Sequence, residues 1–164
     1  NTWGYVRYGG TKFHDGLDLI GEPGVTPVYA MYSGKVIRVV SQQPNRISRT
    51  KYPSEYTGDK NDAGNRVTIE TQLPNGRTIR VSYWHLDIAA NNPYTQTLKY
   101  GSTVEQGQII GIVGKTGNAI GGLPHLHIKT YMVGTDAKKD PINNPFNYLY
   151  TKFSPESGKT TRDC

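Results

Sequence analysis

The four histidines of this 164-residue chain lie in three short stretches whose residue types suit metal-assisted chemistry. The stretches are FHDGLD at 13–18, YWHL at 83–86 and PHLH at 124–127. A zinc hydrolase needs two or three imidazole nitrogens, a carboxylate and a general base brought together. These stretches hold all of those groups and leave no histidine elsewhere, so they predict a hydrolytic metal site.

The pair His125 and His127 is the clearest of these patterns. Residues two apart on a strand point to the same face, so the two imidazoles should project together while Leu126 and Ile128 point into the core. Two imidazoles on one face favour metal binding. The alternative is a pair of hydrogen-bonded histidines without a metal.

The other two stretches are weaker alone. By strand alternation His85 should share a face with Ile79, Val81 and Tyr83, at a strand end where its side chain reaches a cleft. A single strand histidine is more often an ordinary hydrogen-bonded residue.

His14 and Asp18 would stack on one face of a helix, but Gly16 and the following Leu-Asp-Leu favour an extended approach into a strand. Asp and Gly also occur in ordinary turns, so it is the combination of the three stretches that favours a metal site.

The elements that must position these residues are mostly strands. Alternating or apolar runs between glycine and proline residues predict strands at Thr26–Tyr32, Lys35–Ser41, Asn65–Thr71, Thr78–Trp84, Gln108–Gly114 and His125–Tyr131. Asn75-Gly76 predicts a hairpin that pairs Arg66–Leu73 with Arg77–Trp84.

The connections between these strands differ in length. Residues 42–64 and 87–101 form long connections, which are candidates for the rim of a substrate groove. A turn or two of helix could lie in Asp87–Tyr94, and the polar tail 154–164 should be mobile.

Bulk properties exclude several classes of protein. The length fits one domain, and Cys164 is the single cysteine, which excludes an intrachain disulfide and a thiolate zinc site. No apolar run approaches the roughly 20 residues of a membrane helix, so a soluble protein without membrane insertion is expected, and we expect a monomer. Because the chain starts at Asn1 without a signal-like segment, it should be a processed protein or an excised domain.

The net charge of +6 favours anionic partners such as nucleic acid, an acidic membrane or a teichoic-acid-bearing wall. One segment interleaves basic residues with Tyr52 and Tyr56. Its basic residues are Arg46, Arg49, Lys51, Lys60 and Arg66. The same segment contains Glu55, Asp59 and Asp62 and matches no nucleic-acid-binding module, so it is better explained as a solvated loop, and no nucleic acid partner is expected.

Taken in order, these motifs resemble the M23 zinc metallopeptidases, the lysostaphin-like or LytM-like endopeptidases. The resemblance covers about residues 8–149 and uses motifs in the family's order. They are His14-x-Gly-x-Asp18, Pro27-Val-Tyr-Ala-x-x-x-Gly34-x-Val36, Tyr83-x-His85-Leu86, Val104-x-x-Gly107-Gln-x-Ile-Gly111, Gly114-x-Thr116-Gly117-Asn118 and His125-Leu-His127.

The resemblance implies an all-β domain over residues 1–153, with a central antiparallel sheet and long loops flanking a zinc-containing groove. It assigns His14, Asp18 and His127 to one Zn²⁺ ion, with a fourth position left open for chemistry.

It makes His85 and His125 the catalytic histidines, without dividing the proton transfers between them. Tyr8 is a further candidate for stabilising the oxyanion, and Asn118 for contacting the substrate.

The implied function is hydrolysis of peptide bonds in bacterial peptidoglycan by a secreted, periplasmic or wall-associated enzyme, with wall polymers as possible anionic partners. The alternative is a catalytically silent domain that binds peptidoglycan or regulates another hydrolase. The chain departs from the family in the long, charged segment 42–64 and in Gly121-Gly122-Leu123, so the resemblance does not identify the cleaved bond.

Overall fold

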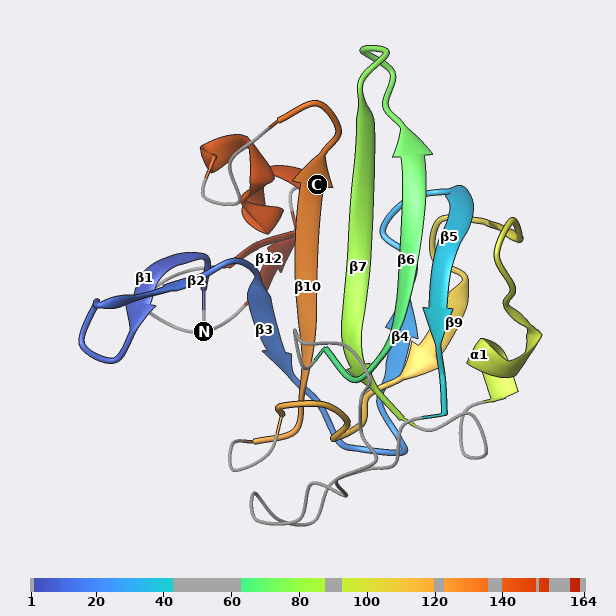
Figure 1. Cartoon of the computed structure of the whole chain (residues 1–164), viewed down its shortest axis with the longest axis horizontal. Helices are drawn as coiled ribbons and strands as arrows, with labels where there is room; N and C mark the ends of the chain where they lie inside the picture. The colour runs from blue at the N-terminus through green and yellow to red at the C-terminus, as the bar shows by residue number, and fades with distance from the viewer. Residues whose placement is uncertain are drawn as a thin grey trace.

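The computed structural model describes residues 2–42, 63–87, 93–119, 123–135 and 140–149, and the backbone of 151–153 and 160–162. A six-stranded antiparallel sheet forms its centre, in the order β3-β10-β7-β6-β5-β8 (Figure 1). The strands are β3 (Leu17–Ile20), β10 (His125–Met132), β7 (Thr78–Leu86), β6 (Asn65–Gln72), β5 (Gly34–Val40) and β8 (Thr103–Val104). The predicted all-β class and central antiparallel sheet are confirmed.

The hairpin between β6 and β7 forms at the predicted turn. Gly76 has a φ of +80°, which the missing Cβ permits, and the Asn75 side chain accepts a hydrogen bond from the Arg77 amide at 3.1 Å. The Leu73 amide donates to the Arg77 carbonyl at 2.8 Å and closes the turn. The hairpin fixes the register of the two long strands that carry the sheet.

One face of the sheet packs on the hydrophobic core. Alternate residues of β7 and β10 are buried there, including Val81, Tyr83, Leu126 and Ile128. The other residues of β10, His127 among them, and those of β7 as far as Trp84 face the opposite side, as strand alternation requires. The prediction that His125 and His127 share one face while Leu126 and Ile128 enter the core is confirmed.

All six predicted strands are present, with small shifts at their ends. The segments predicted at Thr26–Tyr32 and Gln108–Gly114 shorten to β4 (Pro27–Tyr29) and β9 (Ile109–Ile112), which pair with each other outside the large sheet. A bulge near Tyr29 limits their pairing.

The remaining elements are short and lie around the sheet. The N-terminal hairpin of β1 (Gly4–Arg7) and β2 (Lys12–His14) precedes β3 (Figure 1). Outside the sheet lie α1 (Pro93–Thr97), η2 (Pro141–Asn143), η3 (Pro145–Tyr148) and the pair β11 (Thr151–Phe153) and β12 (Thr160–Arg162).

Two of the predicted connections are only partly visible. The helical turn predicted in Asp87–Tyr94 begins only at Pro93, and residues 43–62 and 88–92 lie outside the described part. Within that part, no helix has the length and apolar character needed to cross a membrane.

Candidate active site

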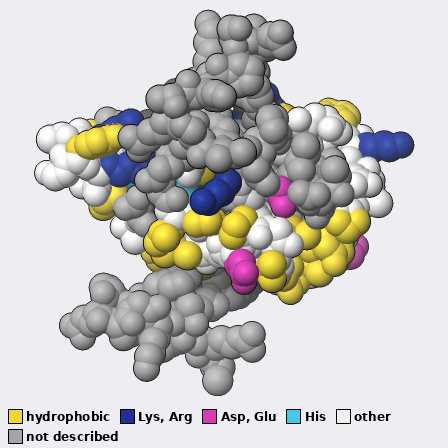
Figure 2. Space-filling model, turned by 90° about the horizontal axis from the view of Figure 1, so that it is seen from below, with side chains coloured by type: hydrophobic (Ala, Val, Ile, Leu, Met, Phe, Trp, Pro, Cys, Tyr) yellow, Lys and Arg dark blue, Asp and Glu magenta, His cyan; other side chains and the backbone are white. Residues whose placement is uncertain are grey.

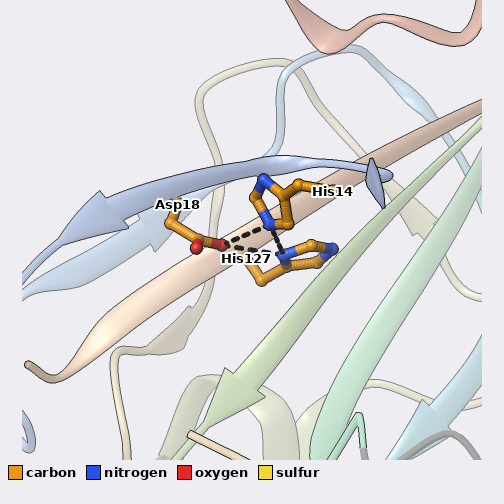
Figure 3. A group of neighbouring side chains, drawn as sticks. All are labelled: His14, Asp18 and His127. Carbon is orange, nitrogen blue, oxygen red and sulfur yellow. Dashed lines mark hydrogen bonds and ion pairs between the residues drawn. The ribbon is translucent and has the colours of Figure 1, made fainter. Parts of the chain in front are cut away.

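Three predicted metal ligands converge where β3 meets β10. Asp18 lies directly opposite His127 in the β3–β10 register, and His14 ends β2 just before β3. The Nε2 atom of His14 lies 3.1 Å from the Nδ1 atom of His127 and 3.1 Å from the Oδ1 atom of Asp18. His127 Nδ1 lies 2.8 Å from the same Oδ1 (Figure 3). Two nitrogens and one oxygen therefore face a common point.

These donor atoms fit a tetrahedral zinc ion. Bonds of about 2.0–2.1 Å separate tetrahedral ligand atoms by roughly 3.3 Å, close to the distances between these three atoms. His14 Nδ1 lies 2.8 Å from the Thr2 carbonyl, which accepts its proton and leaves the lone pair of Nε2 facing the cluster. Lone pairs this close repel one another unless a cation, either protons or a metal ion, lies among them.

The Asp18 carboxylate is oriented from its other side by Arg7. Arg7 Nη2 donates to Asp18 Oδ2 at 3.0 Å, so Oδ1 is left for the two histidines. Burial alone would raise the pKa of Asp18, but hydrogen bonds and charge interactions with His127 and His14 outweigh it and hold that pKa far below its usual range. Asp18 is therefore ionised and oriented toward the two histidines, as a metal ligand would need to be.

The His127 ring is held between Trp84 and Gly16. The Trp84 and His127 ring centroids lie 4.7 Å apart with the planes tilted by 33°. A Cβ on Gly16 would meet Cε1 and Nε2 of His127 at 2.4 Å and the Ile128 carbonyl oxygen at 2.6 Å. The glycine of the motif at 14–18 is thus needed for the close approach of this ring.

His85 lies on the same side of the sheet as the cluster of His14, Asp18 and His127, which we call the metal cluster. The prediction that it shares a face with Ile79, Val81 and Tyr83 is wrong. Trp84 and His85 of β7 together oppose Arg66 of β6, which is a β-bulge, and His85 has a φ of +62°. Strand alternation would direct His85 toward the core with Tyr83. Instead its ring lies 5.0 Å from that of His125 and 6.1 Å from that of His127.

The loop after β9 fixes the His85 ring. His85 Nδ1 donates to the Thr116 carbonyl at 2.9 Å, which leaves Nε2 with a lone pair. Thr116 is itself anchored, since its hydroxyl donates to the Leu86 carbonyl and accepts from the Asn65 amide, each at 2.8 Å. Burial, followed by the nearby His125 and His127, lowers the pKa of His85 to about 3. It is therefore neutral at pH 7.

His125 is more exposed than His85. Its Nδ1 donates to the Leu123 carbonyl at 2.9 Å, and its Nε2 lies 3.7 Å from Asp18 Oδ1. By contrast His14, His85 and His127 are almost fully buried. Viewed from below, the molecule shows a small patch of histidine surface beside lysine and arginine side chains (Figure 2).

A cleft of about 420 Å³ opens beside these histidines. His85 and His127 contribute to its wall, and Trp84 and Asn118 line it as well. Asn118 is exposed there, where a substrate could reach it. Tyr8 instead lies 78% exposed in the turn between β1 and β2, with Lys12 over its ring, and is not among the described residues that line the cleft.

Comparisons with known proteins agree with this geometry. The model of peptidase family M23 matches residues 12–143. The chain belongs to peptidase family M23. A curated relative, the L-Ala--D-Glu endopeptidase of Bacillus subtilis (strain 168), is 30% identical over 137 residues, covering 80% of this chain and 33% of the relative. The chain thus spans about a third of that relative's length.

Solved structures confirm the M23 fold. The solution structure of lysostaphin is 27% identical with a TM-score of 0.55, and the match covers 87% of this chain and 47% of that one. A zinc-containing peptidase from Vibrio cholerae is 26% identical with a TM-score of 0.52, covering 85% and 34%. A mutant catalytic domain of the prophage-encoded M23 protein EnpA from Enterococcus faecalis is 24% identical with a TM-score of 0.53, covering 82% and 79%.

Within this M23 domain, three residues that position the site had no role in the sequence prediction. Trp84 and Thr116 lie inside two of the family motifs, at 83–86 and 114–118, so the motifs could have pointed to these positions. Arg7 lies outside every motif and reaches Asp18 only because the β1–β2 hairpin folds back. The functional roles stay predictions: metal binding for His14, Asp18 and His127, catalysis for His85, His125 and Tyr8, and substrate contact for Asn118. The domain limits, 1–153 with a tail at 154–164, stay predictions as well.

Substituting Gly16 should test the close approach of the His127 ring. We expect Gly16→Ala to lower zinc affinity at least tenfold, because the new methyl group needs space that His127 and the Ile128 carbonyl occupy. Competition with a chelator measures the affinity. The control is Gly101→Ala, which strains a positive φ where nothing lies within 4 Å and should change stability but not zinc affinity. Equal zinc affinity in Gly16→Ala and wild type would contradict this role.

Arg7 should act on metal affinity through the Asp18 carboxylate. Replacing a group that orients a metal ligand typically costs 10- to 100-fold in affinity, so Arg7→Gln should weaken zinc binding by roughly tenfold. Lys12→Gln removes the same charge from the same hairpin without touching Asp18 and serves as the control. If the two variants bind zinc equally well, the hydrogen bond from Arg7 to Asp18 does not contribute to zinc affinity.

Stability of the metal-free protein should fall as the pH is lowered from about 6.5. His85 titrates near its ordinary pKa of about 6.5 in the unfolded chain but near 3 in the folded one, so acid protonates the unfolded state first. The free energy of unfolding should drop by up to about 1.4 kcal/mol per pH unit for this group. Urea unfolding of the metal-free protein, with a chelator present, at pH 7, 6 and 5 measures this decrease in the free energy of unfolding. His85→Gln should make the free energy of unfolding less dependent on pH. If the wild-type protein shows no pH dependence, the predicted contribution of His85 is wrong.

Proposed function

We propose that this chain is a zinc-dependent endopeptidase that hydrolyses peptide bonds of bacterial peptidoglycan. The observation that carries the proposal is the convergence of His14, Asp18 and His127 on one point, with His85 and His125 in ring contact beside it. Three protein ligands leave a fourth position open, which is typical of a catalytic site and not of a structural one.

The three ligands would hold the ion, and the remaining histidines would move protons. When bound, zinc polarises the scissile carbonyl and lowers the pKa of water to about 7. His85 is neutral, and its fixed Nδ1–H leaves Nε2 able to accept a proton from the attacking water.

His125 is oriented in the same way. Its Nδ1–H is donated to the Leu123 carbonyl, so Nε2 has a lone pair that can accept a proton. Once protonated, Nε2 can pass that proton to the leaving amine or donate to the developing oxyanion. Both histidines reach the cleft side of the sheet, so either can serve the attacking water. We propose the pair as the proton-transfer groups and leave their order open.

Peptidoglycan is the proposed substrate because one relative is named for cleaving a bond between L-Ala and D-Glu, a D-amino-acid linkage. The Bacillus subtilis relative is an L-Ala--D-Glu endopeptidase by name, and lysostaphin has the same fold. The formal charge of +6 suits an anionic wall. Such a substrate places the enzyme outside the cytoplasm, in the periplasm or at the wall.

A wall-hydrolysis assay with metal removal tests the proposal. Purified peptidoglycan should release peptide fragments in the presence of the protein, a chelator should stop the release, and one equivalent of zinc should restore it. Mass spectrometry of the fragments identifies the bond. Wall binding without hydrolysis under every metal condition would instead support a catalytically silent domain.

A further inference from the structure

The imidazole ring of His127 has a second nitrogen whose role the metal cluster does not explain. Its Nδ1 atom faces His14 and Asp18, whereas its Nε2 atom points away from both (Figure 3). This Nε2 atom is buried and has no hydrogen-bond partner within the described part of the chain. Buried polar atoms are nearly always hydrogen-bonded, so an unpaired one on a proposed metal ligand needs a physical explanation.

The position of the ring proton supplies that explanation. When no ion is bound, the proton belongs on Nδ1, which lies 2.8 Å from the Asp18 carboxylate, and Nε2 has a lone pair. A metal ion binds a nitrogen lone pair, so a zinc ion at Nδ1 requires the single N–H of the neutral ring to lie on Nε2. Metal binding would therefore create a buried donor at Nε2, and this donor would need an acceptor.

Asp15 is placed to be that acceptor. Its Oδ1 atom lies 3.9 Å from His127 Nε2, and a movement of about 1 Å would bring the two atoms to the usual hydrogen-bond distance of about 2.9 Å. The Asp15 side chain is 30% exposed, so it has room for such a movement. The next residue, Gly16, has no side chain, and a Cβ there would lie 2.4 Å from the same Nε2 atom. The approach to this nitrogen is thus left open.

Lys129 holds the Asp15 carboxylate in this place. It lies two residues after His127 on β10, so both side chains project from the same face of the sheet. The Nζ atom of Lys129 forms an ion pair with Oδ2 of Asp15, which leaves Oδ1 nearer to His127. Asp18 is held in the same manner, since Arg7 binds its Oδ2 atom and leaves Oδ1 for the metal cluster.

The contacts of the His127 ring leave one motion for Asp15 to restrict. Trp84 packs against the face of the ring, and Lys129 Nζ lies 5.6 Å from the centroid of the Trp84 ring. Packing against a ring face limits tilting but allows the ring to turn within its own plane. A hydrogen bond at Nε2 would fix that direction and keep Nδ1 aimed at the metal cluster.

We propose that Asp15 positions His127 for metal binding by accepting a hydrogen bond from its Nε2–H, with Lys129 holding the carboxylate in place. This inference rests on the zinc binding of the proposed function. Carboxylates that accept from a metal-bound imidazole fix its tautomer and orientation and raise its basicity as a ligand. Asp15 is a positioning residue and not a member of the metal cluster.

Zinc affinity measured by competition with a chelator tests the inference in four variants. Asp15→Ala removes the acceptor and should weaken zinc binding about 10- to 100-fold, whereas Asp15→Asn keeps a neutral acceptor oxygen and should lose only several-fold. Lys129→Ala breaks the same ion pair but keeps the carboxylate, so its loss should be smaller than that of Asp15→Ala. Glu105→Gln removes a negative charge just after β8, at the opposite edge of the sheet from β3, and should bind zinc like wild type.

The His127 ring proton gives a second measurement that a general loss of charge would not change. NMR of the zinc-loaded protein with nitrogen-labelled histidine should show His127 protonated at Nε2, with slow exchange of this proton because it is buried and hydrogen-bonded. Exchange should be faster in Asp15→Ala and unchanged in Glu105→Gln. Circular dichroism of each variant checks that the sheet is retained.

Wild-type zinc affinity in Asp15→Ala would overturn the inference. Equal losses in Asp15→Ala and Asp15→Asn, with wild-type exchange of the ring proton, would also overturn it, because charge alone would explain them. Hydrolysis of peptidoglycan by the wild-type protein would leave the proposed function standing in both cases. Conversely, the expected order of zinc affinities without any hydrolysis would support the role of Asp15 and refute the peptidase.

Discussion

Replacing His127 with alanine should give a folded protein that neither retains zinc nor hydrolyses peptide bonds. The Nδ1 atom of His127 is one of three donor atoms at the cluster, and two ligands are too few for a tight site. Hydrolysis should fall below detection, and zinc measured after gel filtration should fall well below one equivalent.

A matched control separates ligand loss from misfolding. Lys129→Ala truncates the next cleft-facing residue of the same strand, and it should retain zinc. Circular dichroism should show β-sheet in both variants, because Leu126 and Ile128 still anchor β10 in the core. Full zinc content in His127→Ala would remove His127 from the ligand set.

Truncating His85 should also reduce activity but should leave the zinc content unchanged. We expect His85→Ala to keep one equivalent of zinc but to lose about 10²- to 10⁴-fold in kcat, the usual contribution of a positioned proton-transfer group. His85 makes none of the contacts within the His14, Asp18 and His127 cluster. Steady-state rates on a defined wall peptide, with zinc measured in the same samples, test this expectation.

Thr116→Val provides a graded comparison with His85→Ala. It removes the hydroxyl that holds the loop but keeps the carbonyl that orients His85, so kcat should fall less than in His85→Ala. A His85→Ala enzyme with wild-type kcat would leave His125 as the proton acceptor. Loss of zinc from His85→Ala would instead mean that His85 supports the metal cluster.

The sequence was sufficient to predict the parts of the fold that follow strand periodicity. The β6–β7 hairpin depends on Asn75-Gly76, and the two faces of β10 depend on alternation between His125, Leu126, His127 and Ile128. Both signals are local, since a turn needs particular backbone angles and a strand alternates with period two. That Asp18 and His127 would come together was implied by the family resemblance, and their pairing across β3 and β10 follows from no local rule.

Two features of the site could not be predicted from local patterns. The orientation of His85 depends on a bulge in which a histidine, and not a glycine or asparagine, has a positive φ, so no residue type marks it. The contact of Arg7 with Asp18 needs the N-terminal hairpin to fold back over β3, which only tertiary packing determines. Residues 43–62, which include most of the basic and aromatic segment, lie outside the described part and leave that prediction as it stood.

The placement of the metal ligands has a consequence for chain topology. Asp18 belongs to the edge strand β3, which pairs with β10 alone, and His14 ends β2 just before it, whereas His127 belongs to a strand paired on both sides. An ion bound by all three would cross-link the start of the domain to its interior and close a loop of more than a hundred residues. The ion would then also hold the β2–β3 segment to the rest of the domain. Loss of the metal would loosen the same segment that supplies two of its ligands.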